Sequence, residues 1–126
     1  MITGDVKNAP NSYKVQFNNI NNALVSITRF HEKSLAVTQY FEGDKSTERL
    51  VRLEYFPGRQ VQYYEGDKGE ERKVRIEFPS PNRQVAYYEG DKGEEIKVRV
   101  EFPNGQVAYY EGDKDEERRV REEFPF

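Results

Sequence analysis

Carboxylates are the most abundant groups in this sequence that could do chemistry, with 23 aspartates and glutamates in 126 residues. Many recur in one phrase, Glu-Gly-Asp-Lys followed closely by a pair of acids. A calcium site needs six to eight oxygen ligands that converge on one ion, whereas these acids alternate with lysines and are spread along the chain. The pattern therefore predicts a solvated acidic edge and no metal site. The acids concerned are Asp67, Glu70, Glu71, Asp91, Glu94, Glu95, Asp113, Glu116 and Glu117.

Nucleophilic and acid–base catalysis lack the residues that they need. The chain has no cysteine and one histidine, His31, which stands at an expected hairpin turn. Ser26, Ser34 and Ser46 are available as partners, but none stands in a nucleophile-elbow or oxyanion-hole pattern. A glycosidase needs one carboxyl group whose pKa is raised by an apolar pocket, and evenly repeated exposed glutamates do not supply it. We therefore expect no enzymatic activity, no cofactor and no small-molecule substrate.

The tyrosines recur at fixed places because the chain repeats a unit of roughly 23 residues. The stretch 87–108 has close copies on both sides, and a last copy stops part-way through. Such a period indicates one supersecondary unit stacked on copies of itself. We therefore divide the chain into an N-terminal capping segment with a degenerate hairpin, 1–39, and a repeat array, 40–126. The array contains the units 40–62, 63–86 and 87–108 and the partial unit 109–126.

The composition favours an extended repeat protein over a closed globule. Hydrophobic residues make up 35% of the chain and charged residues 34%, which leaves little material for a deep core. Without cysteine there is no disulfide framework and no thiolate metal site. The N-terminus lacks a signal-peptide pattern, and no apolar run has membrane-spanning length. We expect a soluble intracellular protein, and the net charge of −3 gives no reason to expect a nucleic-acid partner.

Each unit carries the alternating pattern of two strands around a turn. Lys97–Phe102 and Gln106–Glu111 alternate on either side of Asn104-Gly105, which is a strong signal for a two-residue hairpin turn. Pairing across that turn sets Val100 opposite Tyr109, so the first tyrosine of each pair is predicted on an apolar face and the arginines on the other. The predicted apolar surface comprises Tyr63, Ile76, Phe78, Tyr87, Val100, Phe102 and Tyr109, and the predicted charged face includes Arg52, Arg75, Arg99 and Arg121.

The N-terminal part predicts less regular strands. Tyr13–Phe17 alternates as a first strand, and a loop of asparagines follows it. Leu24–His31 and Leu35–Phe41 predict a hairpin with its turn at 32–34. We expect the polar residues 1–12 to form a loose or capping start.

Three details of register also follow from the pattern. Tyr87 stays on the face of Val98 only if the connection holds an even number of residues, so we expect a tight turn within Asp91–Glu94. The extra aromatic residue at Phe56 predicts a β-bulge there. At a position that is apolar in the other units, the last strand has Glu122. This inward charge would block edge-to-edge pairing, although sequence drift at a frayed end explains it equally well.

A Tyr-Glu-Gly or Phe-Glu-Gly stands at a fixed point of each unit, and the turn Asn104-Gly105 precedes the last copy. With this period, residues 40–126 resemble the MORN repeat (membrane occupation and recognition nexus). They depart from it in having Val-Arg-Val-type strands in place of an internal Gly-x-Gly, and no tryptophan after the tripeptide. The matching tripeptides are Phe41-Glu42-Gly43, Tyr64-Glu65-Gly66, Tyr88-Glu89-Gly90 and Tyr110-Glu111-Gly112.

The resemblance implies a curved single-layer sheet of hairpins with an aromatic-lined groove. It also implies protein contacts, self-association into dimers and, in some members, phospholipid contact. A protist or a large DNA virus is the implied source, with the virion as the location in the viral case.

Together these observations predict an all-β protein, an elongated single-layer antiparallel meander of stacked hairpins. Its apolar face must curl on itself, be covered by residues 1–23 or be buried by a second chain, and the sequence leaves these alternatives open. We expect a non-enzymatic scaffold that binds other proteins and forms a homodimer through the predicted apolar surface. The alternative is a peripheral membrane module, in which Arg52, Arg75, Arg99 and Arg121 recognise acidic phospholipid headgroups.

Overall fold

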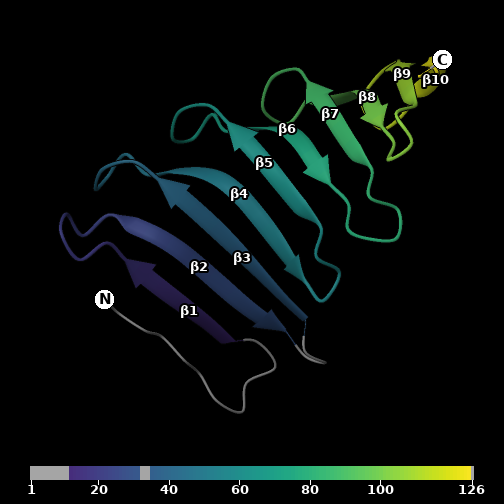
Figure 1. Cartoon of the computed structure of the whole chain (residues 1–126). Helices are drawn as coiled ribbons and strands as arrows, with labels where there is room; N and C mark the ends of the chain where they lie inside the picture. The colour runs from purple at the N-terminus through teal and green to yellow at the C-terminus, as the bar shows by residue number, and fades with distance from the viewer. Residues whose placement is uncertain (1–11, 32–34, 126) are drawn as a thin grey trace.

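The part of the chain that the structure describes forms a single open antiparallel β-sheet of ten strands (Figure 1). A computed structural model describes residues 12–31 and 35–125. The strands follow one another across the sheet in chain order, so the fold is the elongated β-meander that the repeats predict. The strands are β1 (Ser12–Phe17), β2 (Leu24–His31), β3 (Leu35–Glu42), β4 (Arg49–Phe56), β5 (Val61–Glu65), β6 (Arg72–Glu77), β7 (Val85–Glu89), β8 (Ile96–Glu101), β9 (Val107–Glu111) and β10 (Arg118–Glu123).

The predicted strands are confirmed nearly to the residue. In the N-terminal hairpin, β2 pairs with β3 as far as His31 opposite Leu35. Its expected turn, 32–34, and the expected capping start, apart from Ser12, lie outside the described residues. The expected tight turn within Asp91–Glu94 is present, because the backbone N–H of Glu94 donates to the carbonyl of Asp91 at 2.9 Å.

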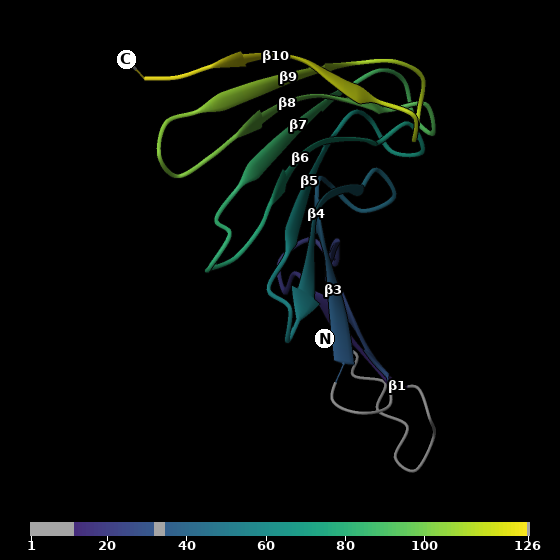
Figure 2. The same cartoon turned by 90° about the vertical axis from the view of Figure 1, so that its right-hand side faces the viewer.

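The sheet twists strongly along its length. Figure 2 shows the strand direction turning steadily from β1 to β10. Twist of this kind is the ordinary result of backbone sterics in L-amino acids, and bulges increase it locally. The two edges of the sheet, β1 and β10, therefore point in different directions although each strand is regular with its neighbours.

The predicted hairpin register is wrong by one residue. The backbone N–H of Phe102 donates to the carbonyl of Gln106 at 2.9 Å, and that of Gly105 donates to Phe102 at 3.0 Å, so the loop has three residues. Pro103 occupies the first turn position, where its fixed φ is suitable, and Gly105 has a φ of +91°. Val100 consequently faces Ala108 rather than Tyr109.

This one-residue shift exchanges the two faces of the returning strands. Tyr109 lies opposite Arg99, and Tyr87 lies opposite both Arg75 and Arg99. The first tyrosine of each pair therefore lies on the arginine face. The predicted apolar surface is divided between the two faces: Ile76 and Val100 on one, and Tyr63, Tyr87 and Tyr109 on the other.

A β-bulge recurs in every unit, always at a valine. Each shift in the ladder leaves one residue of an even-numbered strand without a cross-strand partner. The predicted bulge at Phe56 is wrong, since Phe56 pairs in unbroken register with Ala36. The extra residue there is accommodated in the turn, which closes between the N–H of Tyr55 and the carbonyl of Gln60 at 2.9 Å. The bulged residues are Val25, Val51, Val74, Val98 and Val120.

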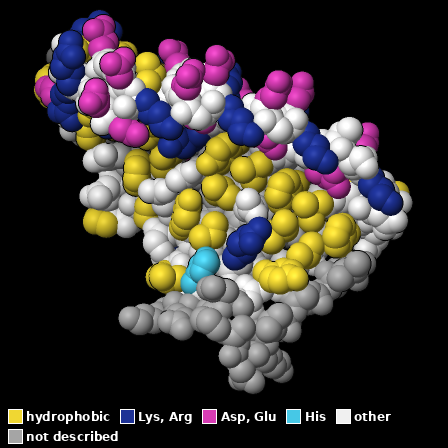
Figure 3. Space-filling model, turned by 180° about the vertical axis from the view of Figure 1, so that it is seen from behind, with side chains coloured by type: hydrophobic (Ala, Val, Ile, Leu, Met, Phe, Trp, Pro, Cys, Tyr) yellow, Lys and Arg dark blue, Asp and Glu magenta, His cyan; other side chains and the backbone are white. Residues whose placement is uncertain are grey.

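The core lies on one face of the C-terminal half, and we call this side of the sheet the apolar face. Ile76, Ala86, Val100 and Ala108 are the buried residues at its centre, with at most 6% of their surface exposed. Four half-buried aromatic residues flank them. Figure 3 shows hydrophobic side chains gathered over this face, with basic and acidic side chains along the loops at one end of the strands. The flanking residues are Phe78, Tyr88, Phe102 and Tyr110.

The second tyrosine of each pair belongs to this apolar face. The ammonium groups of Lys73 and Lys97 lie 4.3 and 4.2 Å from the ring centres of Tyr88 and Tyr110. Burial raises the pKa of Tyr88 and raises that of Tyr64 to about 12. The aliphatic parts of these lysine side chains help to cover the apolar face, which a second sheet would cover in a β-sandwich.

Candidate functional site: the tyrosine–arginine face

Tyrosine and arginine alternate in one unbroken row across eight strands, from β3 to β10, opposite to the apolar face. Each arginine lies over the ring of the tyrosine before it, with distances of 4.1 to 4.2 Å from the guanidinium carbon to the ring centre. A partly exposed contact of this kind contributes about 0.5–1 kcal/mol. The row is Tyr40, Arg52, Tyr63, Arg75, Tyr87, Arg99, Tyr109 and Arg121, and we call this side of the sheet the tyrosine–arginine face.

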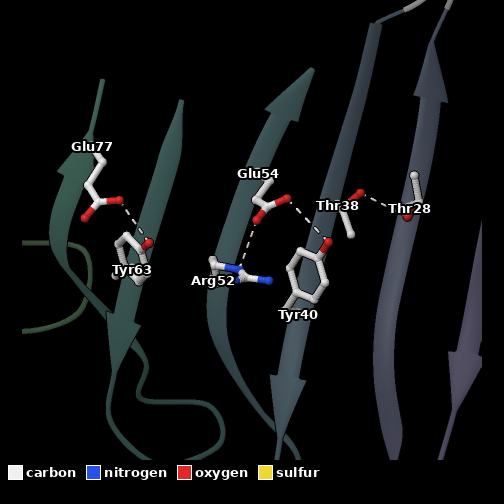
Figure 4. A network of polar contacts seen from close by, with 7 residues as sticks. All are labelled: Thr28, Thr38, Tyr40, Arg52, Glu54, Tyr63 and Glu77. Carbon is white, nitrogen blue, oxygen red and sulfur yellow. Dashed lines mark hydrogen bonds and ion pairs between the residues drawn. The ribbon is translucent and has the colours of Figure 1, made fainter. Parts of the chain in front are cut away.

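A second row, of glutamates, fixes the first. The hydroxyl of Tyr63 donates to Glu77 at 3.0 Å, and that of Tyr87 donates to Glu101 at the same distance. The same glutamates lie within 3.4 and 3.7 Å of guanidinium nitrogens of Arg75 and Arg99. Figure 4 shows the N-terminal copies of this pattern, in which Tyr40 and Arg52 both bond Glu54, and a bond between Thr28 and Thr38 extends the row to β2.

The bulges turn the valines onto the tyrosine–arginine face, where they form three equivalent depressions. The first lies between Tyr40 and Tyr63, the second between Tyr63 and Tyr87, and the third between Tyr87 and Tyr109. Their volumes are about 360, 460 and 470 Å³. Two bulge valines and one arginine of the row line each depression. A tyrosine such as Tyr63 or Tyr87 is a wall shared by two depressions. The valines and arginines are Val25, Val51 and Arg52 in the first, Val51, Val74 and Arg75 in the second, and Val74, Val98 and Arg99 in the third.

The arginines of this face are already paired. Arg52, Arg75, Arg99 and Arg121 each lie within 3.2 to 3.7 Å of a glutamate oxygen on the same strand. These pairs are more than one-third exposed, so each contributes little to folding free energy. They do, however, cancel the positive charge that recognition of acidic phospholipids requires.

The last glutamate of each acidic loop joins its unit to the preceding one. The repetition of these acids in the sequence could have indicated this role. A bulge disrupts the ladder locally, and the last glutamate of the next loop accepts a hydrogen bond from the backbone N–H just before the bulge valine. The N–H of Lys73 donates to Glu95 at 2.9 Å, and that of Lys97 donates to Glu117 at 2.8 Å. Glu48 and Glu71 accept the equivalent bonds from Leu24 and Leu50. We call these four bonds the glutamate clips.

The clips hold the carboxylates in their charged form. At Glu117 the hydrogen bond from Lys97 is the main cause of a lowered pKa. At Glu95 partial burial raises the pKa, but the hydrogen bonds from the backbone of Lys73 and of Glu95 itself outweigh it, so the pKa is lowered. Each unit is thereby fastened to the unit before it at the loop edge.

Lysines of the same loops make a second set of bonds between units. The ammonium group of Lys92 donates to the carbonyl of Gly69 at 2.7 Å, and that of Lys114 donates to Gly93 at 2.6 Å. Among residues 12–31 and 35–125, no group of three or more histidines, cysteines or acids is arranged to hold a metal ion. The acids and lysines of the phrase thus join neighbouring repeats.

The remaining predicted residues lie outside the row of tyrosines and arginines, although Ser26 shares their face. His31 ends β2 at the exposed edge of the apolar face, while Ser26 is buried on the opposite face. Glu122 lies opposite Ala108, so its predicted inward position is confirmed, and it accepts a hydrogen bond from Arg119. Sequence reasoning missed the bulge valines and the clips. The valine before each Arg-x-Glu and the second acid of each loop were the available signals.

The tripeptide that carries the family resemblance has a steric cause. Gly66 has a φ of +118°, and a Cβ there would lie 2.6 Å from the carbonyl oxygen of Glu70. Gly90 is restricted in the same way, by Glu94 at 2.8 Å. The described residues include no helix long and apolar enough to span a bilayer. Comparison of the chain with protein-family models, curated proteins and solved structures finds no match in any of the three.

Proposed function

We propose that this protein is a non-enzymatic scaffold that binds other proteins. The observation that carries the proposal is the row of three equivalent, open depressions on a face whose row of arginines is already paired with glutamates. A broad repeated surface of this kind suits an extended partner better than a small substrate. The MORN-like motifs are consistent with the same role.

We further propose that the chain forms a homodimer through the N-terminal half of the apolar face. The C-terminal half of that face buries its own centre, whereas Tyr13 and Leu35 on the N-terminal half are 47% and 49% exposed. Apolar side chains left in contact with water favour association, and a second copy would cover them.

Solution mass by light scattering tests the dimer. The intact chain should have twice the monomer mass, and the double variant Tyr13→Ser, Leu35→Ser should be a folded monomer. Phe30→Ser is the matched control, because Phe30 is also exposed, at 41%, but lies on the tyrosine–arginine face. A double variant that stays dimeric would place the contact elsewhere, and a monomeric intact chain would contradict self-association.

Recognition of acidic phospholipids is the alternative, and the pairing of all four arginines with glutamates disfavours it. Sedimentation with vesicles that contain phosphatidylserine distinguishes the two proposals. Binding that weakens with salt and is lost in Arg75→Gln, Arg99→Gln would support the membrane role.

A further inference from the structure

We infer that the tyrosine–arginine face binds a basic, proline-rich segment in the polyproline II conformation, with one turn of the ligand in each depression. This inference rests on the proposed protein-binding role and is independent of the proposed dimer. Three properties of the face support it: the spacing, the chemistry and the charge of the depressions.

The spacing of the depressions matches the pitch of a polyproline II helix. Equivalent residues recur every second strand, as Tyr63 on β5, Tyr87 on β7 and Tyr109 on β9 do. Strands lie about 4.8 Å apart, so the depressions repeat every 9.6 Å or so across the sheet. A polyproline II helix has three residues per turn and rises about 3.1 Å per residue, which gives about 9.3 Å. An extended strand repeats a side-chain direction about every 6.8 Å and would fall out of step.

The chemistry of each depression suits proline. Rings of two tyrosines form the walls, and two bulge valines add an apolar surface between them. Proline-rich segments dock in aromatic-lined grooves, where their pre-formed backbone loses little entropy on binding. Their carbonyl oxygens have no internal partners, and the arginine of each depression offers N–H donors to them.

The rim of the depressions carries a small excess of negative charge. The second is lined by Glu42, Glu65, Arg49 and Arg75, and Glu77 pairs with Arg75, so three glutamates oppose two arginines. The third adds Glu89 and Glu101 against Arg72 and Arg99, and it shares Glu65 with the second. The two depressions together therefore have five glutamates and four arginines. The residue opposite Glu65 is the cation Arg72, whereas the residue opposite Glu89 is the uncharged Ile96. A basic ligand would complement this excess.

The face needs little rearrangement before it binds. The side chain of Arg75 is stacked on Tyr63 and held by Glu77, and that of Arg99 is held by Tyr87 and Glu101 in the same way. The clips fasten each unit to the one before it. Preorganisation lowers the entropic cost of binding, which matters for shallow depressions.

A peptide of four Pro-Pro-Lys repeats tests the inference, by titration calorimetry and by amide NMR on the full chain. We expect one peptide per chain, with shifts at Val51, Val74 and Val98. A peptide of four Gly-Ser-Lys repeats has the same charge without the rigid backbone, and it should bind at least about tenfold more weakly. A peptide of four Pro-Pro-Glu repeats should not bind. Equal binding of either control peptide would overturn the inference.

Charge reversal at the rim gives the matched variants. Glu65→Lys, Glu89→Lys should weaken binding of the Pro-Pro-Lys peptide at least about tenfold. Glu70→Lys, Glu94→Lys changes the net charge equally, at exposed loop positions outside the three depressions, and should leave affinity nearly unchanged. Both pairs replace exposed side chains, so folding is preserved and amide spectra can check it.

Val74→Lys is a second test, because Val74 lines both the second and the third depression. It should weaken binding by a similar factor, while Tyr13→Ser on the other face should not. Unchanged affinity in Val74→Lys would overturn the inference. Light scattering on the same samples separates the two proposals. A dimer that does not bind the Pro-Pro-Lys peptide contradicts only this inference, and a monomer that binds the peptide contradicts only the proposed dimer.

Discussion

The two halves of the sheet use the same row of the apolar face differently. Across β6 to β9 the row reads isoleucine, alanine, valine, alanine, and at most 6% of each residue is exposed. Across β2 to β5 the row reads isoleucine, glutamine, leucine, glutamine, and every member is only half-buried. A single-layer sheet can therefore bury a core, but only where the aromatic side chains on either side of the row can pack against its centre.

Alanine makes the difference between the halves. Ala86 and Ala108 leave room beside Val100, so Phe78 and Phe102 on one side and Tyr88 and Tyr110 on the other can pack against the centre. Gln39 and Gln62 occupy the equivalent places in the N-terminal half with long polar side chains. Alternation of large and small residues is a general way of filling an interior without strain.

The largest expected difference between the halves comes from truncating one isoleucine in each. Ile76→Ala should lower the free energy of unfolding by about 3 kcal/mol, because Ile76 is 6% exposed and its removal leaves a cavity. Ile27→Ala at the equivalent, half-buried place should cost about 1 kcal/mol. Urea unfolding monitored by circular dichroism measures both. Equal losses would mean that the two halves are packed alike.

A glycine pair in one loop gives the next effect. Gly66→Ala should cost about 2 kcal/mol, since the new Cβ would meet the carbonyl oxygen of Glu70 at 2.6 Å with φ at +118°. Gly69→Ala is the matched control in the same turn, because it also has a positive φ, +87°, but no atom within 4 Å of the new Cβ. Its cost should be about 1 kcal/mol. Thermal unfolding of both variants measures the difference, and an equal cost would remove the steric explanation of the tripeptide.

The periodic part of the fold could be predicted from the sequence, because strand alternation and repetition are local properties. The strand order and the tight turn at Asp91–Glu94 follow from such patterns and are confirmed. The faces could not be assigned in this way, because parity depends on the exact length of every turn. Asn104-Gly105 was predicted as a two-residue turn, and it is instead the end of a three-residue loop that begins at Pro103.

Most tyrosines and arginines of the candidate site were predicted, whereas its bulge valines and its arrangement were not. Arg75 and Arg99 were placed on a charged face, which is confirmed, but their tyrosine partners were placed on the other face. The length of the turn moves Tyr109 to the face of Arg99. The bulges at Val74 and Val98 move these valines to the same face, and an alternating pattern does not show where a bulge occurs. The clips depend on contacts between units, which one unit read alone does not contain.

The clips are common to both halves, so they should respond to acid alike. Because the pKa of Glu95 is lowered in the folded state, its contribution is complete above the usual value near 4.5 and is lost as the pH falls through the folded value. Glu95→Ala should cost about 1 kcal/mol at pH 7 and little at pH 3, after allowance for solvent screening. Glu94→Ala, at the exposed neighbouring position, is the control and should change neither value.

The N-terminal clip extends the same test. Glu48 also has a lowered pKa, mainly because the backbone N–H of Leu24 donates to it, so Glu48→Ala should show the same direction of pH dependence. Urea midpoints measured from pH 7 to pH 3 compare the variants. A pH dependence in Glu95→Ala that equals that of the intact chain would show that the clip contributes nothing to stability.

The smallest expected loss of stability comes from removing tyrosine hydroxyls. It compares the two halves of the sheet on the tyrosine–arginine face. The hydroxyl of Tyr87 donates to Glu101 at 3.0 Å, whereas that of Tyr40 donates to Glu54 at 3.4 Å. Tyr87→Phe keeps the ring under its arginine and removes only the hydrogen bond, so it should cost about 0.5–1 kcal/mol. Tyr40→Phe should cost less, because the longer bond is weaker.

Paired urea titrations can resolve this difference only if the two variants have equal m-values, which both should, since neither changes the surface that folding buries. A larger loss in Tyr40→Phe would show that the N-terminal half depends on its glutamate row more than the C-terminal half does. The polar face would then compensate for the core that the N-terminal half lacks. A larger loss in Tyr87→Phe would instead mean that the half with the better-packed apolar face also has the stronger hydrogen bonds on the tyrosine–arginine face.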